Sequence, residues 1–577
     1  MNFCKIAVLL VLAGSQMIWA QTWTISKVVD NTTACPGSSS GVFNPLGTFP
    51  AIYGPWVVFS DPGDDSCTAN NGPSIWSYNL ITKAFVKLVD TSTAIPEGTG
   101  DFVGLSAVGS NNNLQVNEGT VLFYGYGSGY NSTTNCTGGL YTVSVAGGKI
   151  YRVVDYTMAL PGYGGNFCGV NTSNGINGLL GMSLSRGKVV FSAEAVGAPS
   201  ANDGVWWAPA NVNTTESDLH LIADMSTVYT SPFPAGCSPG FCQIIDQWVG
   251  GFIEGSTIAF TGGSPVGADG LFVNSPTTPI LLSSHVLPGD TAHNSGYPDD
   301  ASYYSGPVVD GDGIFFVASD PFYDGTCASG AFTGVFKTGL SGSTIGSILN
   351  TCDTQPNGDS IGANSFNQLA ANEGTAIFEV LDSTTGNYVL DSYVNGVLSQ
   401  LIAPGEALPS GASCSGAYHA TGCATGISPP GTGSINGGRF VFGASGGAYW
   451  YDDGIYVASL TCAASDTKDV SIALGSLTYD SADKLWLQSA TVTNSGTKAL
   501  SGPLSLVLAD LTSGVSLANP NGTTVCFAPE RSSYINLALP AGNKLAVGSK
   551  AQVTLAFSDP SDAGITFTTE VAGPGAR

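Results

Sequence analysis

The sequence predicts an all-β protein, because a short apolar motif ending in phenylalanine recurs along the chain and no amphipathic helical pattern accompanies it. The spacing of the copies runs from 56 residues (260 to 316) to 69 residues (191 to 260). One unit of such a repeat cannot bury its apolar face alone, so neighbouring copies must pack together. The seven copies of this phenylalanine motif end at Phe59, Phe123, Phe191, Phe260, Phe316, Phe378 and Phe442.

Each repeat contains further strand-like segments around the phenylalanine motif. A Gly-apolar-aromatic segment such as Gly204-Val205-Trp206 follows it, and then an apolar segment that often ends in aspartate, such as Lys87-Leu88-Val89-Asp90. A Pro/Gly loop and a less regular segment lead to the next copy. Four short strands per repeat are typical of a β-propeller blade, so seven copies predict a seven-bladed β-propeller.

The two ends of the repeat region are offset in a way that favours a closed ring. The aspartate-ending segment has an extra copy at Lys27-Val28-Val29-Asp30, before the first phenylalanine motif, whereas the last repeat stops after Gly454-Ile455-Tyr456. The N-terminal strand is therefore expected to complete the last blade, which removes two unpaired sheet edges. A solenoid or a string of sandwiches is the alternative, but neither explains the offset.

Three regions follow from this pattern. Residues 1–20 resemble a secretory signal, with Lys5, an apolar run and Ile18-Trp19-Ala20 as the cleavage site. Residues 21–461 are the predicted propeller, and residues 462–577, with alternating strands, are predicted to form an immunoglobulin-like β-sandwich. No segment is long and apolar enough to predict a transmembrane helix. We expect a protein that is secreted or held at the cell surface.

Cysteine usage agrees with export. Cys4 leaves with the signal, and the twelve cysteines that remain are an even set, which in an oxidising compartment indicates disulfides rather than metal ligands. The propeller cysteines all fall in the connections predicted at one face, where the long loops also gather. We expect sequential pairs: Cys35 with Cys67, Cys136 with Cys168, Cys237 with Cys242, Cys327 with Cys352, Cys414 with Cys423, and Cys462 with Cys526.

The charge balance excludes some partners. Only 10% of residues are charged, and 17 Lys and Arg against 42 Asp and Glu give a net charge of −25. Without a basic patch, nucleic acids and anionic membrane surfaces are poor partners. The sequence does not determine the oligomeric state.

The repeat resembles a bacterial family of exported proteins with tandem units of the form V-x-D-x-x-x-x-x-P-x-G…F…V-x-F…G-I-Y. Residues 88–102 carry the resemblance, with weaker copies over roughly 23–460. The stretch with Asn494-Ser495-Gly496 is similar to an immunoglobulin-like module of bacterial exported proteins. The family implies an exported propeller without an assigned activity, so it supplies no catalytic residue. Many relatives end in a C-terminal sorting anchor, and residues 572–577 do not resemble one.

Two aspartate-rich loops on the cross-linked face suggest a cation site. Hard oxygen ligands on short loops suit calcium, the one cofactor that we consider. Alternatively, each aspartate caps a turn through its own backbone, which is common in Asp-Pro and Asp-Gly sequences and is the interpretation that we favour. The residues are Asp61, Asp64, Asp65, Asp320 and Asp324.

Tyrosines on the same face suggest contacts with sugars or peptides, because a glycine-flanked tyrosine on a loop has few reasons to belong to a core. The alternative is that they pack against neighbouring loops. The candidates are Tyr126, Tyr130, Tyr163 and Tyr323. Of the four histidines, His220 and His285 are expected to be structural, whereas a general base is conceivable at His293 or His419.

These observations favour a non-enzymatic, exported binding or surface scaffold protein, whose partner is an extracellular carbohydrate, another extracellular polymer or a protein. No G-x-S-x-G or comparable catalytic signature is found. One alternative is a hydrolase or lyase of extracellular polysaccharide, which needs two carboxylates about 5–10 Å apart. A further alternative is a structural subunit of a cell-surface assembly.

Overall fold

The computed structural model is all-β in the part of the chain that it describes, apart from a 3-10 turn, η2 (Glu216–Asp218). No helix there is both long and apolar enough to cross a membrane. The predicted signal lies outside the described residues. The structure describes residues 22–37, 41–43, 46–47, 49–63, 67, 72–105, 114–127, 138–161, 165–170, 181–195, 204–224, 227, 247–263, 270–276, 278–282, 286–290, 303–310, 313–320, 332–342, 344–372, 374–384, 386–394, 397–403, 406, 408–409, 426–427, 430–431, 433–445, 454–461, 469–481, 484–501, 504–520, 522–524, 532–539, 544–559 and 564–573.

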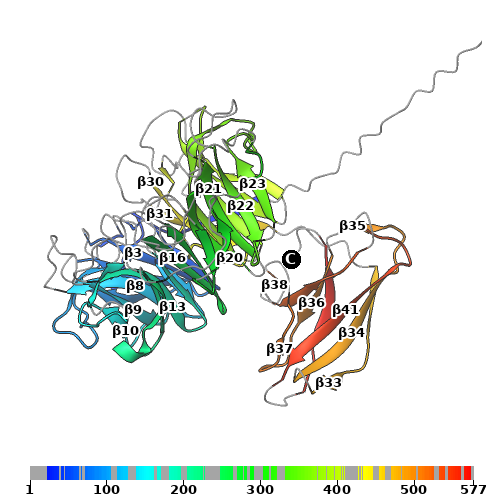
Figure 1. The fold of residues 1–577 in the computed structure, drawn as a ribbon, viewed down its shortest axis with the longest axis horizontal. Coiled ribbons are helices and arrows are strands. Elements are labelled where there is room, and N and C mark those ends of the chain that lie inside the picture. The colour runs from blue at the N-terminus through cyan, green and yellow to red at the C-terminus, as the bar shows by residue number, and fades with distance from the viewer. Residues whose placement is uncertain are drawn as a thin grey trace, which may run out of the picture.

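Strands up to Thr461 form seven antiparallel sheets, in three of which the first strand is split into two segments (Figure 1). The first three are β2 (Ala51–Tyr53), β3 (Trp56–Asp61), β4 (Ser74–Asn79) and β5 (Phe85–Asp90); β6 (Phe102–Leu105) with β7 (Gln115–Asn117), β8 (Thr120–Gly127), β9 (Gly138–Ser144) and β10 (Tyr151–Asp155); and β11 (Phe167–Val170) with β12 (Met182–Ser185), β13 (Lys188–Ala195), β14 (Gly204–Pro209) and β15 (His220–Asp224).

The next three sheets are β16 (Gln247–Glu254), β17 (Thr257–Gly263), β18 (Gly270–Val273) and β19 (Pro279–Leu282); β20 (Tyr303–Asp310), β21 (Gly313–Asp320), β22 (Phe332–Gly339) and β23 (Ile345–Asn350); and β24 (Ile361–Asn372), β25 (Thr375–Asp382), β26 (Tyr388–Val394) and β27 (Val397–Ile402). The last is β28 (Gly426–Ile427) with β29 (Ile435–Asn436), β30 (Arg439–Ser445), β31 (Gly454–Thr461) and β1 (Thr22–Asp30).

The N-terminal strand completes the last of these sheets, as the offset of the repeats predicted. β1 pairs antiparallel with β31, with Thr22 opposite Thr461 and Asp30 opposite Gly454. Side chains of β1 are part of the core, since Val29 is fully buried in a cluster that also contains Ile455. The beginning and the end of the repeat region are therefore one sheet.

The first strands of successive sheets contact one another in an order that returns to its start. β2 contacts β7, β7 contacts β12, and the series continues through β16, β20, β24 and β29 back to β2. In every sheet two residues separate the first strand from the second, as Gly54 and Pro55 separate β2 from β3. Each of these connections is a tight hairpin within one sheet.

Hydrogen bonds join neighbouring sheets at these two-residue connections. A backbone N–H of one sheet donates to a side-chain oxygen at the end of the first strand of the preceding sheet. One of the bonds joins the two ends of the repeat region, because Gly54 belongs to the first sheet and Asn436 to the last. The donors and acceptors are Gly54 to Asn436 Oδ1 (2.8 Å), Gly255 to Ser185 Oγ (2.9 Å), Gly374 to Asp310 Oδ2 (2.8 Å), Gly437 to Asn372 Oδ1 (3.0 Å) and Arg186 to Asn117 Oδ1 (3.4 Å).

The phenylalanine motif forms the core between sheets. All seven phenylalanines lie in second strands and are buried. Phe123 and Tyr141 of one sheet pack in the same cluster as Val58 and Ile75 of the preceding sheet. The aromatic side of each sheet thus covers the aliphatic side of its neighbour, which buries both surfaces. Burial of a side chain of this size contributes about 1.5–3 kcal/mol.

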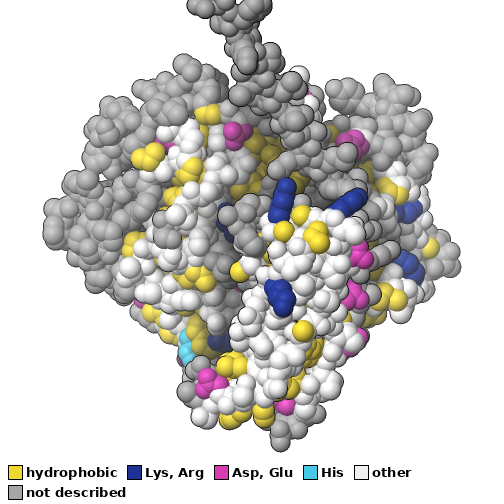
Figure 2. Space-filling view, turned by 90° about the vertical axis from the view of Figure 1, so that its right-hand side faces the viewer, with side chains coloured by type: hydrophobic (Ala, Val, Ile, Leu, Met, Phe, Trp, Pro, Cys, Tyr) yellow, Lys and Arg dark blue, Asp and Glu magenta, His cyan; other side chains and the backbone are white. Residues whose placement is uncertain are grey.

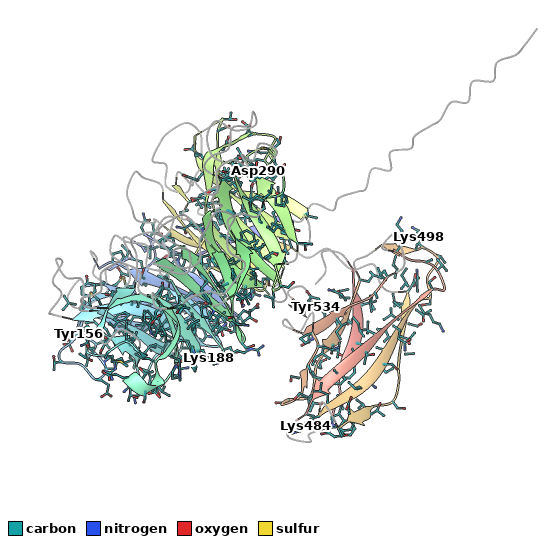
Figure 3. The ribbon with its side chains drawn as sticks, viewed as in Figure 1. Tyr156, Lys188, Asp290, Lys484, Lys498 and Tyr534 are labelled. Atoms are coloured by element: carbon teal, nitrogen blue, oxygen red, sulfur yellow. A yellow bond between two sulfur atoms is a disulfide. The ribbon has the colours of Figure 1, made fainter. Side chains whose placement is uncertain are left out.

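Strands after Thr461 pair only among themselves in the part of the chain that the structure describes. Two of their sheets share one hydrophobic cluster, with Val492 and Leu555 from one and Leu506 and Ile535 from the other. Lys484 and Lys498 mark the two ends of this part (Figure 3). Its strands are β32 (Val470–Leu474), β33 (Thr478–Asp480), β34 (Leu485–Asn494), β41 (Lys550–Ser558) and β37 (Ser516–Leu517); β38 (Gly522–Thr523), β39 (Ser533–Asn536), β36 (Ser505–Ala509) and β42 (Thr568–Ala572); and the pair β35 (Leu500–Ser501) and β40 (Lys544–Leu545).

We predict that Phe59→Ala lowers the free energy of unfolding by about 3–5 kcal/mol, because it leaves a cavity between two sheets. Urea unfolding followed by tryptophan fluorescence measures the loss. The control is Ile81→Ala, since Ile81 is 79% exposed, and it is expected to change stability by less than about 0.5 kcal/mol. Equal small effects of the two substitutions would show that the phenylalanine motif is not the core.

Candidate functional site

The candidate site is the end of the sheets opposite the two-residue connections. Because the strands are antiparallel, the connections between second and third strands lie at that end, together with those leading from a fourth strand to the next sheet. We call it the disulfide-braced end. The predicted site residues Asp64, Asp65, Asp324, Tyr130, Tyr163 and Tyr323 lie outside the described residues.

The aspartate that ends the fourth strand of a repeat organises the connection that follows it. Oδ1 of Asp90 accepts hydrogen bonds from the backbone N–H of Ser92 (3.0 Å), the Ser92 hydroxyl (2.6 Å) and the Thr93 hydroxyl (3.1 Å). The N–H of Phe102 then donates to the carbonyl of Thr93, which sets the start of the next sheet. The recurring aspartate of the sequence is therefore a turn-capping residue.

The same arrangement recurs in other sheets. Asp30 accepts hydrogen bonds from Thr32 and Thr33, Asp155 from Thr157, and Asp224 from Thr227. Three of these aspartates also pair with a cation three residues earlier in the strand. The pairs are Lys27–Asp30, Lys87–Asp90 and Arg152–Asp155.

These contacts shift the pKa of the capping carboxyls. Burial alone raises the pKa of Asp90, but hydrogen bonds from Lys87 and Ser92 and the Lys87 charge outweigh it and lower the pKa to about 2. The pKa of Asp30 is lowered in the same way, against the effect of burial, by hydrogen bonds from Lys27, Thr33 and Thr32. The ionised form is the one that the fold stabilises.

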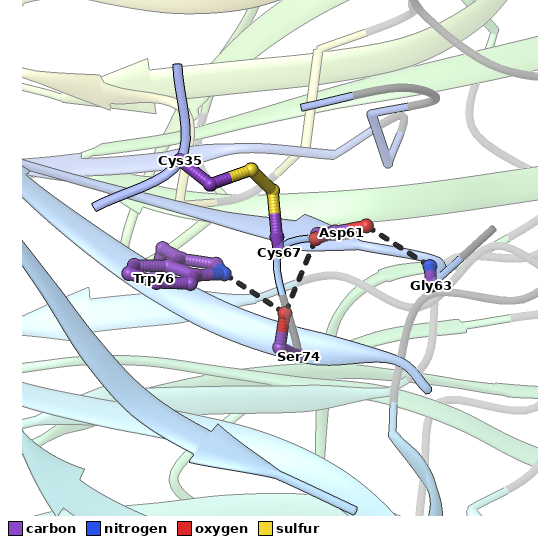
Figure 4. Close-up of a disulfide and its surroundings, with 6 residues drawn as sticks. All are labelled: Cys35, Asp61, Gly63, Cys67, Ser74 and Trp76. Atoms are coloured by element: carbon purple, nitrogen blue, oxygen red, sulfur yellow. Dashed lines mark hydrogen bonds between the residues drawn. A yellow bond between two sulfur atoms is a disulfide. The ribbon is translucent and has the colours of Figure 1, made fainter. Parts of the chain in front are cut away.

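One disulfide is fully described at this end (Figure 4). It joins Cys35, in the connection after β1, to Cys67, between β3 and β4, with the Cα atoms 5.2 Å apart. This confirms the first predicted pair. Cys168 and Cys352 are also disulfide-bonded. Their predicted partners, Cys136 and Cys327, lie outside the described residues.

The other three predicted pairs are not tested, because both cysteines of each pair lie outside the described residues. The predicted disulfides of Cys237 with Cys242, of Cys414 with Cys423, and of Cys462 with Cys526 therefore stay predictions.

Asp61 lies beside the described disulfide and is fully buried. Its Oδ1 accepts a hydrogen bond from the N–H of Gly63 (2.9 Å), and its Oδ2 accepts one from the Ser74 hydroxyl (3.3 Å), which in turn accepts one from Trp76 Nε1 (2.8 Å; Figure 4). This geometry is that of a turn cap. Asp320, in the equivalent position of a later sheet, is also buried.

A calcium site stays a prediction. Within the described ranges no group of three or more His, Cys, Asp or Glu side chains is placed to hold a metal ion. Three of the five aspartates considered for calcium lie outside those ranges.

The structure places Tyr126 differently from the prediction. It lies in strand β8, opposite Gly138, and not in a loop. Its ring covers Gly104 of the neighbouring strand β6, where a Cβ atom would collide with the ring. Tyr124 covers Gly138 in the same way. Glycines at these positions make room for half-buried tyrosine rings, so part of each ring serves packing.

Of the histidines, His220 is described and lies in β15, as expected. Its ring stacks on Trp207 at 4.0 Å, and Lys188 Nζ lies 4.6 Å from the centre of the Trp207 ring. The three residues lie on the second, third and fourth strands of the sheet, β13, β14 and β15 (Figure 3 labels Lys188). Histidines 285, 293 and 419 lie outside the described residues.

One buried carboxyl was missed in the sequence. In six sheets the phenylalanine of the motif faces an aromatic residue on the third strand, whereas Phe378 faces Asp391. The signal was present, because the sixth repeat carries Val389-Leu390-Asp391 where the other repeats carry an aromatic residue.

No family model matches the chain, and no curated protein matches it. Solved structures that are similar to it include β-propeller proteins. A prolyl endopeptidase is 10% identical with a TM-score of 0.39, covering 80% of this chain and 56% of its own. The propeller domain of the Trilobed protease from Pyrococcus furiosus is 9% identical with a TM-score of 0.28, covering 62% and 96%. Polysaccharide lyase Uly1 is 11% identical with a TM-score of 0.37, covering 76% and 98%. This chain thus spans just over half the length of the prolyl endopeptidase.

We predict that Asp90→Ala lowers the free energy of unfolding at pH 7 by about 2 kcal/mol. This is the free energy that corresponds to lowering the pKa of Asp90 from 3.8 to about 2 on folding. Because the folded pKa is the lower one, this contribution is complete above pH 4 and is lost as the pH falls towards 2. Urea unfolding from pH 7 to pH 3 measures it. The control is the exposed Asp101, whose replacement by alanine is expected to have little effect at any pH. A loss for Asp90→Ala that stays constant with pH would contradict the capping role.

Non-reducing peptide mapping tests the disulfides. Since Cys168 and Cys352 are already bonded, we expect them to be joined to Cys136 and Cys327, their predicted sequential partners. The described disulfide between Cys35 and Cys67 is the internal control. A peptide joining Cys168 to Cys237 would refute the sequential scheme.

Proposed function

We propose that this protein is an exported, non-enzymatic binding or surface scaffold that presents its disulfide-braced end to carbohydrate or another extracellular polymer. The observation that carries the proposal is the asymmetry of the sheets. At one end, two-residue connections lock neighbouring sheets together; at the other, long connections are cross-linked by disulfides. Loops held on a rigid scaffold are the usual place for binding.

The proposed architecture is a seven-bladed β-propeller over residues 21–461, with a signal peptide at 1–20 and an immunoglobulin-like sandwich at 462–577. Seven sheets, the pairing of β1 with β31 and the returning series of first-strand contacts support the propeller. The shared hydrophobic cluster of two sheets supports the sandwich. The disulfides fit an oxidising compartment, and therefore export.

The roles of three described carboxyls support binding rather than catalysis. Asp30, Asp61 and Asp90 at the disulfide-braced end each accept hydrogen bonds that shape a turn. The fold holds the pKa of Asp30 and of Asp90 below its usual value, whereas a general acid needs a raised one. These residues therefore serve the scaffold.

The character of the surface supports a neutral polymer as the partner. Charged residues are 10% of the chain, and on the face shown in Figure 2 the Lys and Arg side chains are few and scattered. Recognition then depends on hydrogen bonds and on aromatic rings, for which tyrosine is well suited. Tyr126, Tyr130, Tyr163 and Tyr323 remain the proposed contacts.

We predict that the oxidised full-length protein binds one or more polysaccharides on a glycan array without releasing products. Tyr130→Ala is expected to weaken retention about two- to tenfold, and more when combined with Tyr126→Ala, since stacking on a ring contributes about 0.5–1.5 kcal/mol. The matched control is Tyr479→Ala, which removes a tyrosine that is 52% exposed in the C-terminal part.

Thermal unfolding of each variant separates lost binding from lost folding. Release of oligosaccharides would contradict the non-enzymatic scaffold and support the alternative, a polysaccharide hydrolase or lyase. Self-association without glycan binding would favour a structural subunit. Loss of binding on chelation would support calcium in the aspartate-rich loops.

A further inference from the structure

One seam between sheets differs from the others in its core. The phenylalanine of the motif faces an aromatic residue on the third strand in six sheets, and in five of them the two rings lie close together, as Phe260 and Phe272 do with centroids 5.6 Å apart. In the sheet β24–β27 the ring is replaced by the carboxyl of Asp391. The six aromatic pairs are Phe59–Trp76, Phe123–Tyr141, Phe191–Trp206, Phe260–Phe272, Phe316–Phe336 and Phe442–Tyr456.

Asp391 is buried in an apolar seam. Its side chain is fully buried, and neither carboxyl oxygen has a hydrogen-bond partner among the residues that the structure describes. Phe378 across the sheet and Val389 on the same strand belong to a cluster with Val335 and Leu349 of the sheet β20–β23. The residues that pack in the seam between these two sheets are therefore largely apolar.

Three sheets carry a cation on the outer strand opposite the aromatic residue of the third strand, and the sheet of Asp391 does not. Opposite the aromatic ring, the fourth strand carries Lys87 in one sheet and Arg152 in another, and each pairs with the aspartate that ends its strand. Opposite Asp391 the fourth strand carries Gln400, an uncharged side chain. Strand β27, which is described along its whole length, therefore offers the carboxyl no cation to balance its charge.

Other charged groups on the enclosing strands do not offset this burial. Lys337 Nζ lies over the ring of Phe315, 4.5 Å from its centre, and Asp310 accepts a hydrogen bond from Gly374. Burial is the cause of the raised pKa of Asp391, which reaches about 7 against an ordinary 3.8. Among the side chains that the structure describes on these strands, the titratable ones besides Asp391 are Tyr388, Tyr393, Glu379, Asp382, Asp310, Asp320 and Lys337.

We propose that Asp391 makes the seam between the sheets β20–β23 and β24–β27 a pH-sensitive joint, which packs tightly while the carboxyl is protonated and loosens when it ionises. An ionised carboxylate without a partner is strongly disfavoured in hydrocarbon. The protonated form is a small polar group that the seam tolerates. The series of sheets then has one joint whose strength depends on pH near neutrality.

The direction of the effect follows from proton binding. The folded chain holds this proton up to about pH 7, whereas the unfolded chain loses it near 3.8. Stability from this group is therefore complete below about pH 4, falls as the pH rises, and is fully lost above pH 7. Between pH 5 and pH 8 the folding equilibrium constant is expected to fall about a hundredfold on account of Asp391 alone.

The test compares wild type with Asp391→Asn and Asp391→Phe by urea unfolding at pH 5, 6, 7 and 8. Asparagine keeps the shape and cannot ionise, and phenylalanine restores the ring found in the other six sheets. We expect Asp391→Asn to gain about a hundredfold in folding equilibrium constant over wild type between pH 5 and pH 8. The matched control Asp101→Asn alters an exposed carboxyl and should follow wild type at every pH.

Amide hydrogen exchange locates the effect. In wild type, protection of β25 and β26 should fall further between pH 6 and pH 8 than that of β3 and β4, after correction for intrinsic rates, because the joint opens locally in addition to global unfolding. In Asp391→Asn this difference should disappear. A stability difference between wild type and Asp391→Asn that does not change with pH would overturn the proposal, as would an equal loss of protection in all sheets. If Asp391→Phe does not fold, the asparagine variant alone decides.

Discussion

The pairing of β1 with β31 is the constraint on which the rest of the structure depends. It joins residues 22–30 to residues 454–461, so the two ends of the repeat region form one sheet. A second contact joins the first and last sheets near their inner strands, where the N–H of Gly54 donates to Asn436 Oδ1 at 2.8 Å. Without the pairing, β31 would carry an open edge, and the series of first-strand contacts would have two unprotected ends. Contacts of such long sequence separation form late and slowly, since the whole loop must close first.

Within this closed series, the seams between sheets share one packing arrangement, and one seam departs from it. A phenylalanine and a facing aromatic ring cover the aliphatic side of the preceding sheet, and the polar connections at both ends fix the register. At one end of the sheets, aspartates such as Asp90 cap the turns, and at the other end side chains such as Asn372 accept hydrogen bonds from the neighbouring sheet. Asp391 breaks the rule in the middle of a seam. A buried carboxyl there costs stability at neutral pH, so its presence points to a role other than packing.

Much of the fold was predictable because the same pattern of strands recurs in each repeat of the sequence. The positions of Phe59 and its six equivalents predicted the second strand of each sheet, and the extra copy at residues 27–30 predicted the N-terminal strand. The site was less predictable. Tyr126 resembled a loop residue because glycines flank it. Glycine also makes room for an aromatic ring within a sheet, and in the structure Gly104 makes room for the Tyr126 ring in this way. The capping role of Asp90 needs Ser92 and Thr93, which only geometry brings together. Asp391 is visible in the sequence once the third strands are aligned with the phenylalanine motif.

The most direct test of this account is the amide hydrogen exchange of residues 22–30 in the intact protein. If β1 is an integral strand of the last sheet, the β1 amides that pair with β31 are protected from exchange in the absence of urea, far beyond the rate of an unstructured peptide. Exchange of the β1 amides at the rate of an unstructured peptide, while β30 and β31 stay protected, would contradict the closed series of sheets.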